Sequence, residues 1–168
     1  MSPELRDLEQ ITALYRAVAA VPGGLARTSG EIDEHYVGHN LRASLQRGVC
    51  RIARIDGKIV GEIHAYRPGL TVFSHVLSDL TIAVSPDYQG RGLGRALFRS
   101  LLAEVVANQP DIRRVELIAR ESNERAIQFY ESLGFKKEGR MEGRIRSVAG
   151  GFEADIPMAW MRDQARAQ

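Results

Sequence analysis

The stretch Asp79-Leu-Thr-Ile-Ala-Val-Ser-Pro-Asp-Tyr-Gln-Gly-Arg-Gly-Leu-Gly-Arg95 contains the end of a strand pattern, a glycine-rich loop and the start of a helix pattern. Its apolar and β-branched first part predicts a buried strand over Leu77–Val84. Apolar residues at helical spacing then predict a helix over Leu93–Ala107. The loop between them is rich in glycine, which lets a ligand approach the backbone, and the first turn of a helix carries unpaired N–H groups and partial positive charge. The stretch therefore predicts a site for phosphate or pyrophosphate.

Three kinds of phosphate loop can be compared with these residues. A nucleotide-triphosphate loop ends in Gly-Lys-Ser/Thr, but Gly94 is followed by Arg95 and an alanine. A dinucleotide loop needs a glycine where Arg95 stands. The third pattern is Gln/Arg-x-x-Gly-x-Gly/Ala after a strand, and Gln89, Gly92 and Gly94 satisfy it. In this the chain resembles the GNAT family of N-acetyltransferases, whose pyrophosphate loop has this pattern.

A second motif lies farther along the chain. The run Asn123-Glu-Arg-Ala-Ile-Gln-Phe-Tyr-Glu-Ser-Leu-Gly-Phe135 resembles the other signature of the same family, Asn-x-x-Ala-x-x-Phe-Tyr-x-x-x-Gly-Phe. It follows the first motif in the expected order and at the expected distance. The resemblance covers the chain from about Val49 to the C-terminus.

The remaining elements fit an α/β protein. Asp56-Gly57 marks a hairpin turn. The predicted order is α-α-β-β-β-α-β-α-β-β, which favours a mixed sheet. By resemblance it is the GNAT fold, about six strands flanked by four helices. The other predicted elements are helices over 8–18, 32–45 and 124–133 and strands over 49–55, 58–66, 114–119, 135–147 and 153–162.

The N-terminal part departs from the family pattern. Helix-forming sequence follows Met1 almost at once, so the usual first strand looks missing or very short. An unpaired sheet edge is a surface that a second copy can cover, and we therefore predict a homodimer.

Composition narrows the class of protein. The 168 residues predict one domain over residues 1–168, and a net charge of +2 is too small to indicate nucleic-acid binding. No apolar run approaches the roughly 20 residues that span a bilayer, and the N-terminus does not resemble a secretory signal. The single Cys50 excludes an internal disulfide and fits the cytoplasm; we interpret it as a small buried hydrophobe and not as a nucleophile.

The resemblance implies acetyl-CoA as cosubstrate, and no metal. The backbone of Ile82, Ala83 and Val84 would pair with the pantetheine arm, and Gln89 would stand at the entrance of the loop. Asn123 would hydrogen-bond the pantetheine or a water, although Asn is also a good helix N-cap. The pyrophosphate would lie on the backbone N–H groups of the loop, formed by Gly90, Arg91, Gly92, Leu93, Gly94 and Arg95.

Acetyl transfer to an amine needs a proton acceptor, a donor to the acetyl oxygen and an acid for the leaving thiolate. By resemblance, Tyr130 is the acid, which we favour over a role in packing alone, and the N–H of Val84 is the oxygen donor. We assign the base to Asp79, at the start of the central strand. Glu62 and Glu116 are rival candidates for the base. His64 and His75 also lie near in sequence, but a lone histidine on a strand is more often structural, so neither is assigned.

The acceptor depends on the more variable segments. His75–Asp79 and Ala154–Met161 resemble a branch that acetylates free amino acids or other small primary amines. We therefore predict a small-molecule amine or amino acid. The runner-up is a peptide or protein N-terminus, including a ribosomal protein. A different class of function is a non-catalytic acyl-CoA sensor, against which Tyr130 argues because a pure binder needs no acid.

Overall fold

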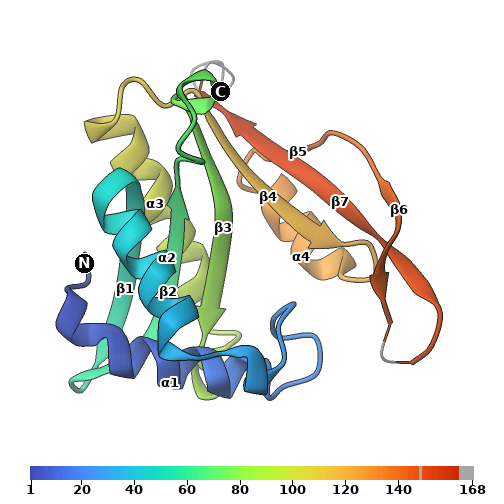
Figure 1. Ribbon diagram of the computed structural model, residues 1–168, viewed down its shortest axis with the longest axis horizontal. Coiled ribbons are helices and arrows are strands. Elements are labelled where there is room, and N and C mark those ends of the chain that lie inside the picture. Colours follow the sequence, from blue (N-terminus) through green and yellow to red (C-terminus); the bar gives the residue numbers. More distant parts are fainter. Residues whose placement is uncertain (148, 163–168) are drawn as a thin grey trace. The chain divides into compact units, whose positions relative to one another are not determined.

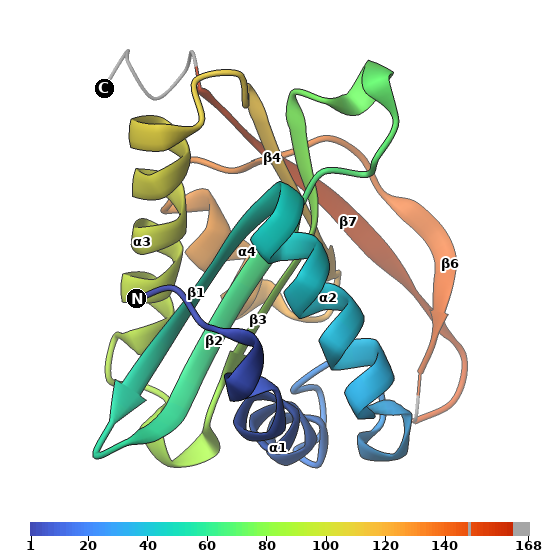
Figure 2. The same cartoon turned by 60° about the vertical axis from the view of Figure 1, so that its left-hand side comes forward.

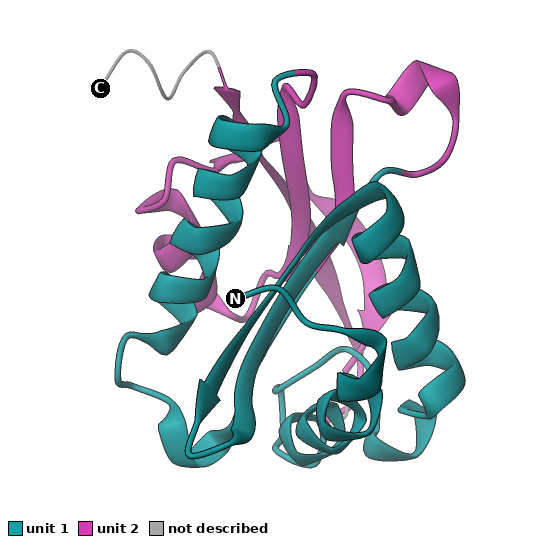
Figure 3. Ribbon diagram, turned by 90° about the vertical axis from the view of Figure 1, so that its left-hand side faces the viewer, with its two compact units in different colours: residues 1–67, 81–110 teal, residues 68–80, 111–168 magenta. Residues whose placement is uncertain are grey.

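The computed structural model describes residues 1–147 and 149–162. Over these residues it contains seven strands and four α-helices, so the α/β class predicted from sequence is confirmed, with one strand more than expected (Figure 1). The chain divides into two compact units, residues 1–67 with 81–110 and residues 68–80 with 111–168 (Figure 3). The single domain over 1–168 stays a prediction.

The first unit is built on the hairpin β1–β2, in which Cys50 pairs with His64 and Ile52 with Glu62. Almost all of β2 is buried, because helices cover both of its faces (Figure 2). Glu62 contacts Tyr15 of α1, and the adjacent Gly61 faces Leu97 of α3. The elements of this unit are α1 (Leu8–Ala19), α2 (Glu34–Arg47), β1 (Gly48–Ile55), β2 (Lys58–Tyr66), the end of β3 (Val76–Val84) and α3 (Leu93–Asn108).

The second unit is built on β7. The start of β3 pairs in parallel with β4, and β4 pairs antiparallel with β7 from Arg114–Met161 to Arg120–Asp155. Both β5 and β6 also pair antiparallel with β7. The elements of this unit are the start of β3, β4 (Arg114–Arg120), α4 (Glu124–Glu131), β5 (Lys136–Lys137), β6 (Met141–Arg146) and β7 (Phe152–Met161).

The predicted strand 135–147 is wrong as one element, because it divides into β5 and β6. Lys137 pairs with Met158 and Met141 with Asp155, so three residues of one side face two of the other. Pro157 lies at this point of β7 and has no N–H to donate to a neighbouring strand. The ladder is interrupted there, and the sequence between its two parts leaves the strand conformation.

The described N-terminal residues contain no strand before α1. Met1 nevertheless pairs with β1, because its carbonyl accepts from Ile52 N at 2.8 Å and its amino group donates to Ile52 O at 3.1 Å. The edge of β1 is therefore covered at this one residue. The homodimer stays a prediction, and light scattering at micromolar concentration would test it.

Candidate functional site

The predicted phosphate loop lies between β3 and α3. A short 3₁₀ turn, Pro86–Tyr88, follows the strand, and the chain then reverses through Gly90 and Gly92, with φ of +74° and +78°. Left-handed backbone of this kind favours glycine over any residue with a Cβ. Gly92 is the N-cap of α3, which begins at Leu93. The glycines thus set the path of the loop into the helix.

The start of α3 has the electrostatic character that an anion requires. Gly92 supplies no capping side chain, and the first turn contains no acidic residue. The partial positive charge of the helix end is therefore not offset by a carboxylate of that turn. Arg91 is exposed and holds its guanidinium 5.3 Å from the ring centre of Tyr88. These residues suit a phosphate group.

Gln89 and Gly94 connect the loop to the strand before it. The Gln89 side-chain amide donates to the carbonyl of Val84 at 3.0 Å. A Cβ on Gly94 would lie 3.7 Å from the side chain of Ile82, which is ordinary contact. Ala83, between these strand residues, is fully buried. Within the first unit, the structure therefore brings together the predicted pantetheine strand and the predicted pyrophosphate loop.

Asn123 and Tyr130 both lie on α4 of the second unit. Asn123 is the N-cap, and its side-chain oxygen accepts from Ala126 N at 3.1 Å. The capping alternative is thus confirmed, and the side-chain nitrogen takes no part in that bond. The ring of Tyr130 packs near Phe129 and Phe135, with centres 5.6 and 6.2 Å apart. Burial raises the pKa of Tyr130, so the phenol keeps its proton at neutral pH.

The residues considered as base differ sharply in environment. Asp79 is exposed and lies in the fourth position of β3, not at its start, with φ of +52°. His75 is also exposed. Glu116 accepts from Arg114 at 2.7 Å at the surface. Glu62 and His64 are both almost completely buried, and they are hydrogen-bonded to each other.

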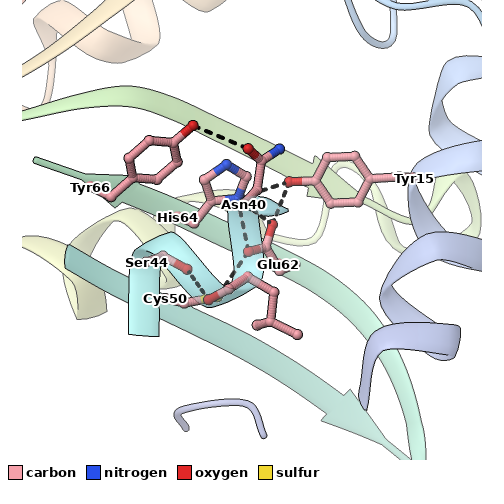
Figure 4. A network of polar contacts seen from close by, with 8 residues as sticks. Tyr15, Asn40, Ser44, Cys50, Glu62, His64 and Tyr66 are labelled. Atoms are coloured by element: carbon pink, nitrogen blue, oxygen red, sulfur yellow. Dashed lines mark hydrogen bonds and ion pairs between the residues drawn. The ribbon is translucent and has the colours of Figure 1, made fainter. Parts of the chain in front are cut away.

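Glu62 is the centre of a buried polar network in the first unit (Figure 4). Its two oxygens accept from Tyr15 OH at 2.5 Å and from Cys50 Sγ at 2.9 Å, and Oε1 lies 3.0 Å from His64 Nδ1. Burial and the charge of Glu62 raise the pKa of both Tyr15 and Cys50, which therefore keep their protons. Beside this carboxylate, the hydroxyl of Tyr66 donates to Asn40.

The sequence alone does not identify Tyr15 as a polar partner of Glu62, and it indicates for Cys50 only a small buried hydrophobe. Cys50 is buried, as predicted, but it also donates a hydrogen bond to a carboxylate. Tyr15 stands on the apolar stripe of α1, where a phenol looks like a core residue. The sequence indicates the buried network only by Glu62 and His64, which occupy alternate positions in the otherwise apolar interior of a strand.

Two further structural findings bear on the type of site. Among residues 1–147 and 149–162, no group of three or more His, Cys, Asp or Glu side chains is arranged to hold a metal ion. In the same part of the chain, the helices are too short or too polar to cross a membrane.

Comparison with known proteins gives one family. Residues 12–135 match the family model described as "Acetyltransferase (GNAT) family". The N-alpha-acetyltransferase RimI of Mycobacterium tuberculosis is 34% identical over 133 residues, covering 77% of this chain and 68% of that protein. The [ribosomal protein bS18]-alanine N-acetyltransferase of Escherichia coli is 48% identical over 78 residues, 46% of this chain; those residues span about half of that relative, 51%.

Solved structures confirm the GNAT fold predicted from the sequence. The crystal structure of the ribosomal-protein-S18-alanine N-acetyltransferase from Escherichia coli has a TM-score of 0.77 at 27% identity, covering 96% of this chain and 91% of that one. A phosphinothricin acetyltransferase from Sinorhizobium meliloti, in complex with acetyl-CoA, has a TM-score of 0.79 at 20% identity and covers 96% and 86%. The second likeness shows the fold alone.

Proposed function

The chain belongs to the GNAT family of acetyltransferases and is an acyltransferase, and from this premise we propose that it acetylates the N-terminal α-amino group of a peptide or protein, with acetyl-CoA as donor. The observation that carries the acceptor is the similarity to two relatives, one named an N-alpha-acetyltransferase and the other a ribosomal-protein-alanine N-acetyltransferase. The sequence alone ranks this acceptor second to a small-molecule amine. The relatives favour it over a small amine.

Acetyl-CoA fits the residues of the first unit. The N–H groups at the start of α3 and the cations Arg91 and Arg95 would hold the pyrophosphate, because glycines at 90 and 92 leave the backbone accessible. The edge of Ile82–Val84 would pair with the pantetheine amides. The side-chain nitrogen of Asn123 would donate a hydrogen bond to the pantetheine, since its side-chain oxygen already caps α4.

The chemistry needs a proton at the departing sulfur and a donor at the acetyl oxygen. Tyr130 would supply the proton, because its burial keeps the phenol protonated at neutral pH. The backbone N–H of Val84 would donate to the oxygen. Asp79 is the proton acceptor that the sequence suggests, and its exposed position lets it meet an ammonium group from solvent.

The decisive experiment measures thiol release from acetyl-CoA with a panel of acceptors. A hexapeptide with a free N-terminal alanine should react much faster than the same peptide with a blocked N-terminus, and faster than free amino acids. Reaction with free amino acids but not with the peptide would show that the acceptor is a small molecule, as the sequence predicts. If coenzyme binds and no acceptor releases thiol, the protein is a sensor and the proposal is wrong.

Replacing Tyr130 by Phe tests the acid separately from binding. The change removes one hydroxyl and keeps the ring that packs against Phe129 and Phe135. We expect turnover to fall about a hundredfold, the size typical of general acid catalysis. Calorimetry should give an unchanged affinity for acetyl-CoA. Unchanged turnover would mean that Tyr130 only packs.

Replacing Gly92 by Asp tests the pyrophosphate loop. The substitution puts a side chain on a left-handed residue and a negative charge at the start of α3, so acetyl-CoA should bind at least tenfold more weakly. Gly57→Asp is the matched control, because Gly57 has φ of +79° and equally open surroundings in the β1–β2 turn. Equal effects of the two variants would contradict the placement.

A further inference from the structure

Glu62 and His64 form a carboxylate–imidazole pair in the buried network of the first unit. His64 Nδ1 lies 3.0 Å from Oε1 and 3.3 Å from Oε2 of Glu62. Both side chains are 2–3% exposed. Among the described residues, all hydrogen bonds of this imidazole are made through Nδ1, and Figure 4 shows the other ring nitrogen on the side away from Glu62.

The donors around Glu62 determine which nitrogen of His64 carries the proton. An ionised carboxylate can only accept, and Tyr15 and Cys50 already direct their protons to its two oxygens. A bare Nδ1 would place its lone pair against those of the carboxylate. The neutral imidazole is therefore protonated on Nδ1, and the lone pair is on Nε2, the nitrogen that can accept a further proton.

The pair lies beside the strand proposed for the pantetheine. Ser85 N donates to Val60 O at 2.9 Å, and a Cβ on Gly61 would lie 3.6 Å from the carbonyl of Ala83. Ala83 also belongs to the core cluster that contains Tyr15 and Cys50. A small cavity, about large enough for one water, is lined by the apolar Ile11, Val37 and Leu41 and by the polar Tyr15, Asn40, Glu62 and His64.

We propose that His64 Nε2 receives the proton of the acceptor's ammonium group through a water in this cavity, with Glu62 as the positioning residue. The inference rests on the proposed acetyl transfer and replaces Asp79 as proton acceptor. Glu62 fixes the tautomer and stabilises the imidazolium by its charge. The titratable groups that face His64 in the described part of the chain are Tyr15 of α1, Cys50 of β1, and Glu62 and Tyr66 of its own strand. On α2, His39 contacts the ring of Tyr66.

The protons balance. The ammonium nitrogen loses one proton to His64, and the free amine then forms the new C–N bond to the acetyl carbon. The C–S bond breaks, Tyr130 gives its proton to the sulfur, and the second proton lost by the nitrogen restores Tyr130. His64 returns its proton to solvent. The sum is one amide, one thiol and one released proton.

The test is the pH dependence of His64→Asn. The Asn amide keeps a donor near the position of Nδ1, so the hydrogen bond to Glu62 survives while the proton-accepting nitrogen is lost. A peptide α-amino group has a pKa near 8, so the variant should be about 30-fold slower in kcat/KM at pH 6.5 and within about threefold of the parent at pH 9. A purely structural role would give the same ratio at both pH values and would overturn the proposal.

Two comparison variants sharpen this result. His35→Asn removes an exposed imidazole of α2 and should leave the rate and its pH dependence unchanged. Asp79→Asn should lower the rate by a factor that does not depend on pH. If Asp79→Asn instead shows the loss that disappears at alkaline pH, Asp79 is the proton acceptor and the inference about His64 is wrong.

The experiment separates failure of the inference from failure of the proposed function. The parent enzyme reports the function by its thiol release with the free peptide. Nitrogen-15 NMR of the histidine rings in the unsubstituted protein reports the tautomer without any turnover. Neutral His64 should carry its proton on Nδ1, also in an inactive protein. A proton on Nε2 would overturn the inference even in an active one.

Discussion

The two units each contain a cluster of carboxylates and donors, and the clusters differ in how much water reaches them. In the first unit, Glu62 is buried and its hydrogen-bond partners are a phenol, a thiol and an imidazole. In the second, Arg114 binds Glu138 with two hydrogen bonds of 2.8 and 2.5 Å at the surface, and also binds Glu116.

This difference decides what each cluster contributes. A buried carboxylate has lost its hydration, so each donor replaces a water that cannot be recovered when the donor is removed. A surface carboxylate exchanges its partner for water at little cost. The buried network therefore stabilises the fold and keeps its protons, while the surface cluster changes little when it is broken.

Glu62→Ala should produce the largest loss of stability. It leaves Tyr15, Cys50 and His64 without their acceptor and opens a cavity between α1 and the sheet. We expect the free energy of unfolding in urea to fall by about 3–5 kcal/mol, because three buried donors lose their acceptor and a cavity replaces the side chain. A loss below about 1 kcal/mol would show that water replaces the carboxylate, and the contrast between the clusters would fail.

Tyr15→Phe should have a smaller effect. It removes one donor to the charged Glu62 and leaves the packing of the ring intact. Hydrogen bonds to charged groups contribute about 1.5–3 kcal/mol, and urea denaturation should show a loss of that size. Tyr36→Phe is a suitable control, because that ring stacks under Arg27 near the surface. Equal losses for both variants would contradict a special role for the buried phenol.

The buried network should weaken the fold at alkaline pH. The pKa values of Cys50 and Tyr15 are raised above their ordinary values of 9.0 and 10.0, so the unfolded chain loses these protons first. Their stabilisation is complete below pH 9 and falls as pH rises, by at most about 1.4 kcal/mol per pH unit for each group. Urea unfolding at pH 8, 9 and 10 measures this loss of unfolding free energy. Cys50→Ser should remove the part of the loss that begins near pH 9, because it removes the thiol.

Arg114→Gln should have the smallest effect. Arg114 lowers the pKa of Glu138, so this pair stabilises the fold above about pH 4.5 and loses its contribution as pH falls below that value. We expect a loss under about 1 kcal/mol at pH 7 by urea denaturation, and a smaller loss at pH 3. A loss comparable with that of Tyr15→Phe would make the two clusters equivalent.

Local patterns predicted the elements and the loop but not the network. Helical spacing located α3, and glycines with the following helix located the phosphate loop, because both depend on neighbours in sequence. The network joins Tyr15 to Glu62, 47 residues away, through the packing of α1 on β2. No local pattern carries that contact. The division of β5 from β6 likewise depends on Pro157 of a different strand.

The strand β3 has a consequence for how the protein can be cut. Its residues Val76–Leu80 belong to the second unit and Thr81–Val84 to the first. Each unit is therefore formed by two separate segments of the chain. Neither unit can be excised as a continuous piece. Deleting residues 111–168 would also remove Arg114 and Val115, the partners of Val76 and Leu77 in β4. We expect limited proteolysis to yield no autonomous fragment, and the described chain to unfold in one transition.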